Sequence, residues 1–476
     1  MGLSAWKQYR NSRWALRVNP SSGNLHPTES YLIRDGRVCH YAPREHALEE
    51  RTMLDRGAWN TFTRSRPGFV VGLTSIHWRE AWKYGERAFR YCQHDTGHAI
   101  ASMRFAAALL GWRLVLLPWS DEEIAAVLGV DRAADFADAE AEEPECVAVV
   151  CAEDVGAWRE ADPGALVAAA RDAAWSGRAN ALSPARVEWP IINQVARVTR
   201  RVRVDGELRD AEPVPPNEEA RRSGADGGLP GAGPALQDRE GVGARAIILQ
   251  RRSAVAFDAQ SSLPRARFMS MLARTRPVGP PWDAIDWSPQ VHLLLFVHRV
   301  DGLTPGVYAY LREPAVLPEW RSATRPEFLW EPQNDSNDSN DSNDSNDSNG
   351  LYLLVPVDVT WVANRLSCDQ DIASDGFFSL GMIARLESSI RDRGEWFYRR
   401  LFWECGMIGQ VLYLEAEAAG ARATGIGCFY DDPVHEVAGL TGTEWQSLYH
   451  FSMGVPVDDD RLTTESGYDW ERPSIP

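Results

Sequence analysis

The feature that most constrains this chain is a repeat that relates its two halves. The pattern Arg-x4-Asp-x-Gly spans residues 90–97, and Arg-x4-Glu-x-Gly spans residues 399–406. Each is followed, at the same interval, by Gly-x-Arg, at residues 111–113 and 420–422. Two copies of one unit in a single chain can pack as the subunits of a homodimer would. The repeat therefore predicts an intrachain pseudo-dimer, and a higher oligomer stays open.

The elements around this repeat predict an α+β unit. Both copies are apolar with helical spacing between the matched residues, and the first of these helices is expected at about Tyr91–Leu110. A strand-like stretch and a second amphipathic segment follow each helix. Strand–turn–strand patterns occur in both halves, at Tyr31–Tyr41 and Leu293–Tyr310, and Glu29–Ile33 is a further expected strand. The matched order of several elements favours duplication.

Composition along the chain divides it into three parts. We predict a first domain at residues 1–160, a linker or mobile excursion at 161–245, and a second domain at 246–476. The linker assignment depends on a stretch rich in Pro, Gly, Glu and Arg. A pure Asn-Asp-Ser repeat at 334–349 is too polar to bury, and we expect a disordered surface loop there, ahead of a strand at Leu351–Val357.

Charge and composition exclude several classes of protein. The net charge of −17 argues against a nucleic-acid partner, which would need a basic face. No apolar run reaches the roughly 18 residues of a membrane span, and the N-terminus lacks the apolar stretch of a secretory signal. The seven cysteines form no CxxC pair and no cluster with His, which indicates reduced thiols. We expect a soluble, cytoplasmic protein.

Asn19–Glu29 is the first segment with chemical character. Its Pro20 favours a turn, its Ser21, Ser22 and Asn24 side chains offer hydrogen bonds, and its glycine allows close approach of the backbone to a ligand. Such a loop suits the polar edge of a planar heterocycle. An ordinary polar turn before a strand is the alternative.

Two segments of the second half have a similar character. Arg251, Arg252 and Ser253 follow a helical stretch, and two guanidiniums with a hydroxyl suit a phosphate. Gly425-Ile426-Gly427 closes a strand and would leave backbone N–H groups free for a ligand. An arginine pair on a solvated helix face and a common glycine turn are the alternatives.

Lys83 and Tyr84 place two proton-transfer groups side by side. Of the 50 basic residues only Lys7 and Lys83 are lysines, and a lysine can be tuned toward neutrality whereas an arginine cannot. Coding bias is the alternative reason. His94 and His98 lie one helical turn apart, but no third ligand is evident, so we predict no metal.

Taken together, these segments resemble the nitroreductase superfamily, and in particular its branch of peptide-azoline dehydrogenases, which oxidise thiazolines and oxazolines. The most specific pieces are Pro20–Pro27 and Lys83–Tyr91, whereas the Arg-Arg-Ser and Gly-Ile-Gly pieces belong to the wider superfamily. The resemblance implies two tandem nitroreductase-like domains, each with a mixed central sheet flanked by helices, and FMN in their interface. Related proteins usually have a helical segment ahead of this motif, whereas this sequence begins almost at Pro20, so we expect either a shortened form or a start further upstream.

The resemblance assigns roles to individual residues. It implies that Arg251, Arg252, Ser253 and Arg461 hold the flavin phosphate and ribityl chain. It implies that Gly425, Ile426 and Gly427 approach the isoalloxazine near N5, and that Pro20, Ser21, Ser22 and Asn24 reach it from the other half. Lys83 and Tyr84 match the catalytic pair of the azoline-oxidising branch.

The distribution of motifs predicts one flavin site per chain. The first half has Pro-Ser-Ser-Gly-Asn but no Arg-Arg-Ser or Gly-Ile-Gly. The second half has both of the latter, but its counterpart loop near Arg276–Asp286 lacks the Ser-Ser-Gly-Asn sequence. A homodimer would have two equivalent sites, whereas this chain keeps the parts of one.

The sequence thus predicts an FMN-dependent oxidoreductase that exchanges hydride at flavin N5, acting as an azoline dehydrogenase on a peptide or small heterocycle. One alternative is an NAD(P)H-dependent reductase of nitroaromatic or quinone-like acceptors, with the nicotinamide as a transient electron donor. Another is a non-catalytic, flavoprotein-derived scaffold of a peptide-modifying complex. Reductive flavin or cobalamin-related chemistry is a further alternative.

Overall fold

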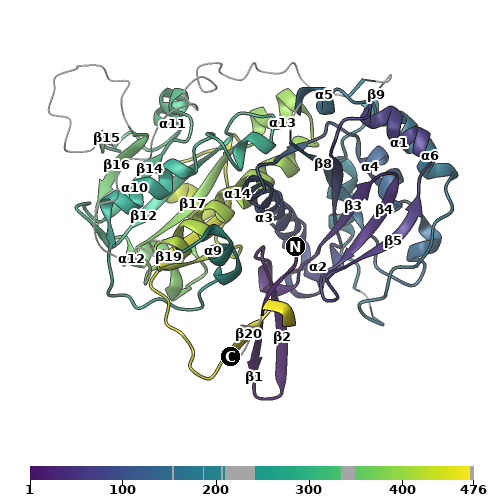
Figure 1. The fold of residues 1–476 in the computed structure, drawn as a ribbon. Helices are drawn as coiled ribbons and strands as arrows, with labels where there is room; N and C mark the ends of the chain where they lie inside the picture. The colour runs from purple at the N-terminus through teal and green to yellow at the C-terminus, as the bar shows by residue number, and fades with distance from the viewer. Residues whose placement is uncertain (153–154, 186, 205–206, 209–241, 334–348, 472–476) are drawn as a thin grey trace.

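The computed structural model describes residues 1–152, 155–185, 187–204, 207–208, 242–333 and 349–471. Two large β-sheets stand on either side of a central pair of long helices (Figure 1). The sheet on one side is formed by the first half of the chain, and the sheet on the other side by the second half. The molecule is therefore built as the repeat predicts, with two α+β units in one chain.

The first sheet has six strands in the order β5-β4-β3-β6-β8-β7. In chain order these strands are β3 (Thr28–Arg34), β4 (Arg37–Ala42), β5 (Ala47–Met53), β6 (Phe69–Ser75), β7 (Arg113–Leu116) and β8 (Glu143–Cys151). The second sheet has seven strands in the order β15-β16-β14-β12-β17-β19-β18. These are β12 (Val291–Val297), β14 (Gly306–Tyr310), β15 (Glu331–Pro332), β16 (Leu351–Pro356), β17 (Phe378–Arg385), β18 (Arg422–Ile426) and β19 (Trp445–Gly454).

The two sheets share one topology. The order β4-β3-β6-β8-β7 of the first sheet corresponds to β14-β12-β17-β19-β18 of the second. Neighbouring strands within both sheets pair antiparallel wherever the structure describes them. A parallel bridge from Ser253 to Ala423 extends the second sheet past β18. The predicted mixture of parallel and antiparallel pairing is thus found, in the described strands of the two large sheets, at this edge alone.

The helices repeat with the strands. Helices α2 (Trp78–Tyr84) and α13 (Glu387–Arg393) have the same length, as have α3 (Ala88–Leu109) and α14 (Phe397–Ala418). Both pairs start at the same separation along the chain. Helices α4 (Asp121–Leu128) and α15 (Asp431–Ala438) end alike, in glycines with left-handed backbones. The predicted duplication is therefore visible element by element.

Helices α3 and α14 cross at two glycines. A side chain at Gly97 would strike the backbone of Trp403, and one at Gly406 would strike the backbone of His94. Because the backbones come this close, both helices are buried nearly all round, and one apolar core runs from one half into the other. The halves thus form one folding unit.

Reciprocal ion pairs join the halves around this crossing. Arg399 of α14 binds Asp121 at the start of α4, with N–O distances of 2.6 and 2.8 Å. Arg90 of α3 binds Asp431 at the start of α15 at 3.3 Å. One pair links α14 of the second half to α4 of the first half, and the other links α3 of the first half to α15 of the second half. This exchange is the arrangement expected of a pseudo-dimer.

A small third sheet brings the two ends of the described chain together. Strands β1 (Leu3–Tyr9) and β2 (Ser12–Arg17) form a hairpin, and β20 (Thr463–Ser466) pairs with β1 (Figure 1). Ahead of Pro20 the structure therefore has a hairpin. The hairpin carries Arg17 and Val18 up to the Pro20–Asn24 loop.

Part of the predicted linker at 161–245 is helical. Helix α6 (Gly164–Asp172) buries Leu166, Val167 and Ala170 in the core of the first half. Helix α7 (Pro190–Val198) buries Ile192 and Ala196 against α2 and α3. These helices form because each has an apolar stripe, which the Pro- and Gly-rich neighbourhood obscured. Residues 209–241 and the Asn-Asp-Ser repeat up to residue 348 lie outside the described residues, and the predicted domain boundaries stay predictions.

The remaining helices are α1 (Arg56–Thr63), α5 (Val155–Arg159), α9 (Ala244–Gln250), α10 (Arg265–Arg274), α11 (Leu317–Ala323) and α12 (Thr360–Leu366). The remaining strands are short pairs, β9 (Arg203–Val204) with β10 (Glu207–Leu208), and β11 (Leu263–Pro264) with β13 (Val300–Asp301).

Candidate functional site between the two halves

The Pro20–Asn24 loop is held rigidly by its own polar groups. Gly23 and Asn24 have positive φ angles of 58° and 60°, which glycine and asparagine tolerate. The His26 N–H donates to Ser21 Oγ at 2.8 Å, and the Asn24 amide donates to the Ala15 carbonyl at 2.8 Å. The loop is therefore a preformed surface, as a ligand-binding loop requires.

Lys83 and Tyr84 lie directly over this loop. A Cβ atom at Gly23 would come within 2.6 Å of the Tyr84 hydroxyl and 2.8 Å of Lys83 Nζ. Glycine at position 23 leaves room for both side chains. The structure thus brings together two segments of the first half, the Pro20–Asn24 loop and the Lys83–Tyr84 pair.

The Gly-Ile-Gly strand end of the second half meets the same region. Gly427 packs against the Tyr91 ring, which stands edge-on to the Tyr84 ring with centroids 4.9 Å apart. Arg87 donates to the carbonyl of Gly427 at 3.3 Å and to that of Phe429 at 3.2 Å. Contacts between the halves therefore place β18 next to the Lys83–Tyr84 pair.

Arg251 and Ser253 reach the region through two contacts. The Tyr413 hydroxyl lies 2.9 Å from Ser253 Oγ and accepts the Gly425 N–H, also at 2.9 Å. Arg251 Nε donates to the Val18 carbonyl at 3.0 Å, just ahead of the Pro20–Asn24 loop. Arg251 is only 4% exposed and lies over the Tyr413 ring. Second-half and first-half motifs thus converge.

Two of the predicted phosphate ligands point elsewhere. Arg252 donates to Ser4 Oγ and to the carbonyls of Leu249 and Arg251. Arg461 is largely exposed, pairs with Asp459 at 2.7 Å and lies near the Tyr9 ring. The structure does not bring Arg461 into contact with Arg251 or Ser253.

The polar atoms of this region fit a flavin phosphate and a flavin ring edge. Within the described residues, Arg251 Nη1 and Asn19 Oδ1 are buried without a hydrogen-bond partner. A buried guanidinium N–H is a strong donor for an anionic oxygen, and an amide oxygen accepts from a ring N–H. Ser253 adds a hydroxyl beside Arg251. The donor set is therefore suited to FMN.

Sequence reasoning missed two carboxyl groups beneath the loop. Glu80 and Asp95 are 0% and 2% exposed. Ser21 Oγ lies 3.4 Å from Glu80 Oε1, and Ser21 and Ser22 act to lower the pKa of Asp95. Burial raises the pKa of both carboxyls far above their usual range, and Asp95 raises that of Glu80 further. Asp95 belongs to the repeat pattern, but the pattern did not indicate a role.

The equivalent place in the second half has different chemistry. By the spacing of the paired helices, Ser389 and Asp392 of α13 stand where α2 has Glu80 and Lys83. Glu404 stands where α3 has Asp95, and it forms a fully buried ion pair with Arg312. Glu404 also accepts the Gln290 and Val291 N–H groups at 3.1 Å. The second equivalent site has thus become a structural ion pair, which agrees with one flavin site per chain.

His94 and His98 serve the helix crossing. His94 Nε2 lies 3.1 Å from the Leu448 carbonyl, and its ring stacks on Tyr449 at 4.0 Å. His98 Nδ1 lies 3.3 Å from the side-chain oxygen of Gln410. In the described part of the chain, no three His, Cys, Asp or Glu side chains are grouped as a metal site would need.

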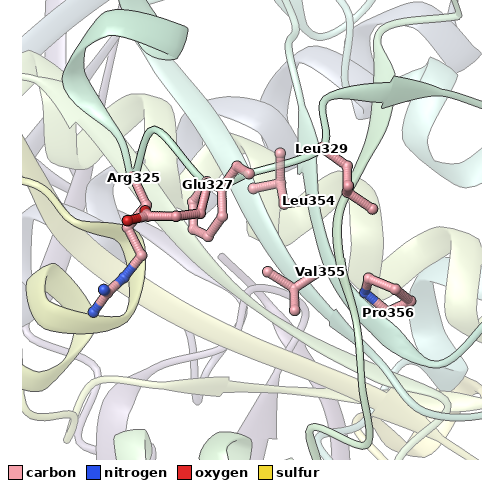
Figure 2. A pocket seen from close by; sticks show the side chains of 7 residues that line it. Arg325, Glu327, Leu329, Leu354, Val355 and Pro356 are labelled. Atoms are coloured by element: carbon pink, nitrogen blue, oxygen red, sulfur yellow. The ribbon is translucent and has the colours of Figure 1, made fainter.

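Two cavities lie apart from these residues. One of about 400 Å³ is lined mainly by apolar groups next to β16, including Phe328, Leu354 and Val355, with Arg325 and Glu327 at its side (Figure 2). The other, of about 440 Å³, lies between the ends of α3 and α14 and helix α9. Neither is lined by a predicted site residue, so the candidate site is defined by its convergent polar groups. Across the described residues, no helix has the length and apolarity to cross a bilayer.

Comparisons with known proteins agree with the two-unit architecture. A nitroreductase-type protein of Anabaena variabilis has a similar structure, with a TM-score of 0.67 and 20% identity, over 96% of this chain and 86% of that one. A Ralstonia eutropha protein of the nitroreductase type matches 48% of this chain and 89% of its own, with 13% identity and a TM-score of 0.29. The Escherichia coli microcin synthetase McbBCD complex matches 29% of this chain and 56% of that one, with 20% identity and a TM-score of 0.26. The fold assignment depends on the first of these.

The fold is thus that of a tandem nitroreductase-like protein. Residues 248–455 match the model of the nitroreductase family. This match lies within the second half of the chain. No curated protein shows significant sequence similarity to the chain.

Proposed function

We propose that the chain is an FMN-dependent oxidoreductase with one composite site between its halves. The observation that carries this proposal is the position of Gly23 under Lys83 and Tyr84, while Gly427 of the other half packs on Tyr91. Motifs from both halves, widely separated in sequence, thus meet in one region. Arg251 and Ser253 would hold the phosphate, the Gly425–Gly427 backbone would face the ring, and Pro20, Ser21, Ser22 and Asn24 would bind its polar edge.

FMN, when bound, would accept a hydride at N5. Lys83 and Tyr84 would supply the acid–base part of the reaction. Both lie above the rigid Gly23 backbone, at the face where the loop and β18 meet. One of them would take the ring proton of a thiazoline or oxazoline as the hydride leaves, so that a hydride and a proton, two electrons and two protons in all, depart and an aromatic azole forms. This substrate class is proposed from the Lys-Tyr pair and the segments around it.

An NAD(P)H-dependent reduction of nitroaromatic or quinone-like acceptors is the second candidate. It needs the same flavin site but gives Lys83 no comparable role in proton removal. The non-catalytic scaffold is the third candidate, and it would have lost either the flavin or turnover. We also propose that the protein acts in the cytoplasm.

The first test is flavin content. We expect the purified chain, reconstituted with FMN, to hold about one flavin per chain by absorbance, and Arg251→Met to weaken FMN binding by at least tenfold. Arg252→Met is the matched control, because its guanidinium is already bound to Ser4 and to nearby carbonyls. Two flavins per chain, or none after reconstitution, would contradict the proposal.

The second test separates the chemistries. Lys83→Met and Tyr84→Phe should abolish azole formation from a model thiazoline peptide but leave FMN bound, whereas Lys7→Met, which changes the other lysine, should leave turnover unchanged. If NADPH bleaches the flavin and all these variants reduce a quinone equally well, the result favours the second candidate, the NAD(P)H-dependent reductase.

A further inference from the structure

The two buried carboxyl groups under the Pro20–Asn24 loop have no counter-charge bound to them. Glu80 Oε2 and Asp95 Oδ2 are buried without a hydrogen-bond partner among the described residues. The Ser21 Oγ lies 3.4 Å from Glu80 Oε1, and Glu80 and Asp95 interact electrostatically. Two buried carboxylates that are shielded from water repel each other, and such a pair retains a proton.

In the second half, the residues equivalent to Glu80 and Asp95 have a purely structural role. Glu404, the counterpart of Asp95, is neutralised by Arg312, and Ser389 replaces Glu80. A buried carboxylate with a guanidinium is a fixed ion pair. Beside the proposed flavin site the chain has instead two carboxyls, and among the described residues no cation forms an ion pair with either of them. This difference between equivalent positions indicates a role in the site beyond packing.

Glu80 is also tied to the proposed catalytic pair by the helix. It stands one turn before Lys83 on α2, and the two side chains interact electrostatically. The loop that contacts Glu80 through Ser21 carries, two residues later, the Gly23 on which Lys83 and Tyr84 lie. A change of charge on the carboxyls would thus change the electrostatic potential at Lys83, which is connected to them by one helical turn and one short loop.

We propose that Glu80 and Asp95 are positioning residues, a carboxyl pair that holds a proton beneath the Pro20–Asn24 loop and sets the charge next to Lys83. This inference depends on the proposed function, since it assigns the pair to the same site. While the pair holds the proton, the charge of the Glu80 and Asp95 pair beneath the loop is less negative. Lys83 then exchanges a proton with the substrate instead of pairing with the carboxyls. Loss of the proton adds a negative charge that binds the lysine ammonium.

The groups that face the pair from surrounding elements are few. Glu80 interacts with Lys83 of α2 and with Tyr91 and Cys92 of α3. Asp95 interacts with Arg17 of β2 and with Tyr449 of β19. Arg17 is itself shared with Glu29 and lies close to Arg79. Arg17 and Lys83 are thus the cations that act on the pair.

The test uses the two lysines of the chain as reporters. Reductive methylation with ¹³C-formaldehyde labels Lys7 and Lys83 and any reactive terminal amine, and NMR then follows each methyl shift against pH. We expect a step in the Lys83 resonance between about pH 7 and pH 10 in the protein without FMN, as the pair ionises. Glu80→Gln and Asp95→Asn should each remove this step, and the Lys7 resonance should not show it.

Glu86→Gln is the matched control, because Glu86 is an exposed carboxylate the same distance along the chain on the other side of Lys83. It should leave the step in place. A wild-type Lys83 resonance without the step would overturn the inference whatever the variants do. So would a step that survives both Glu80→Gln and Asp95→Asn.

A second readout separates this inference from the proposed function. In the FMN-loaded protein, ionisation of the pair should disfavour added electrons, so the midpoint potential should fall more steeply with pH above about pH 8 than in Glu80→Gln. If FMN does not bind, the proposed function fails, while the NMR step still decides whether the pair holds a proton. If FMN binds and the potential has the same slope in both proteins, the positioning role is wrong.

Discussion

At the scale of single residues, the site depends on small side chains placed against large ones. Gly23 makes room for Lys83 and Tyr84, and Gly427 makes room for the Tyr91 ring. Tyr413 joins Ser253 to the Gly425 backbone through one hydroxyl. The chemistry of the loop is therefore set by contacts that a one-carbon change would disturb.

Gly23→Ala tests this directly. Its φ of 58° disfavours any side chain, and the new methyl would collide with Lys83 and Tyr84. We expect a stability loss of about 1–2 kcal/mol from the backbone, together with a clear loss of turnover. Gly111→Ala is the control, because Gly111 has a φ of 72° and no atom within 4 Å of an added methyl. Urea unfolding should show similar losses for the two variants, and only Gly23→Ala should lose activity. Equal activity would mean that the loop does not position the pair.

At the scale of elements, the crossing of α3 and α14 governs the interface. Both helices are 22 residues long and buried on nearly every side. Their glycines at 97 and 406 allow the backbones to touch, and this close approach also sets how far Asp95 and Tyr91 stand from the second half. A helix that is buried on nearly every side is stable here because each face has a partner.

Gly97→Ala should separate these helices. The added methyl would meet the Trp403 backbone, which cannot move as a side chain can, so we expect destabilisation of about 1–3 kcal/mol or more. Gly156→Ala in α5, where nothing lies within 4 Å, should be neutral or stabilising by about 0.5–1 kcal/mol. Thermal unfolding of both variants distinguishes these outcomes. A Gly97→Ala protein as stable as wild type would show that the crossing is looser than the structure has it.

At the scale of the whole molecule, the two halves are arranged like the subunits of a dimer, but they are no longer equivalent. The ion pairs Arg90–Asp431 and Arg399–Asp121 remain equivalent in position, yet they differ in environment. Arg399 and Asp121 are 7% and 5% exposed at their side chains, whereas Arg90 and Asp431 are both 34% exposed. The proposed flavin site lies on one side of the crossing, and the Arg312–Glu404 ion pair occupies the equivalent position on the other.

The two ion pairs should therefore respond differently to loss of arginine. Arg399→Met leaves Asp121 and the neighbouring Glu145 buried without their cation, and we expect a loss of about 3–5 kcal/mol. Arg90→Met removes a half-exposed partner while Asp431 keeps Arg87, so we expect about 1 kcal/mol or less. Equilibrium urea unfolding at neutral pH measures both. Comparable losses would mean that burial does not distinguish the two pairs.

The sequence by itself determined the duplication, the α+β class and the candidate motifs. It could do so because glycine positions, helical periodicity and the Arg-x4-acid pattern are local properties that survive divergence. It predicted a linker or mobile excursion at 161–245, where the structure has helices α6 and α7, since the stripe of a short amphipathic helix is weak beside Pro- and Gly-rich neighbours. It implied a phosphate role for Arg461, whose side chain the structure places on Asp459.

Only the tertiary structure decided which of these motifs meet. The contact of Gly23 with Lys83 joins two segments of the first half, and the packing of Gly427 on Tyr91 joins the two halves. No local pattern relates these segments. The carboxyl pair of Glu80 and Asp95 was also invisible in the sequence. Its character comes from burial and from the absence of a cation such as Arg312 beside it among the described residues, and both are properties of the folded surroundings.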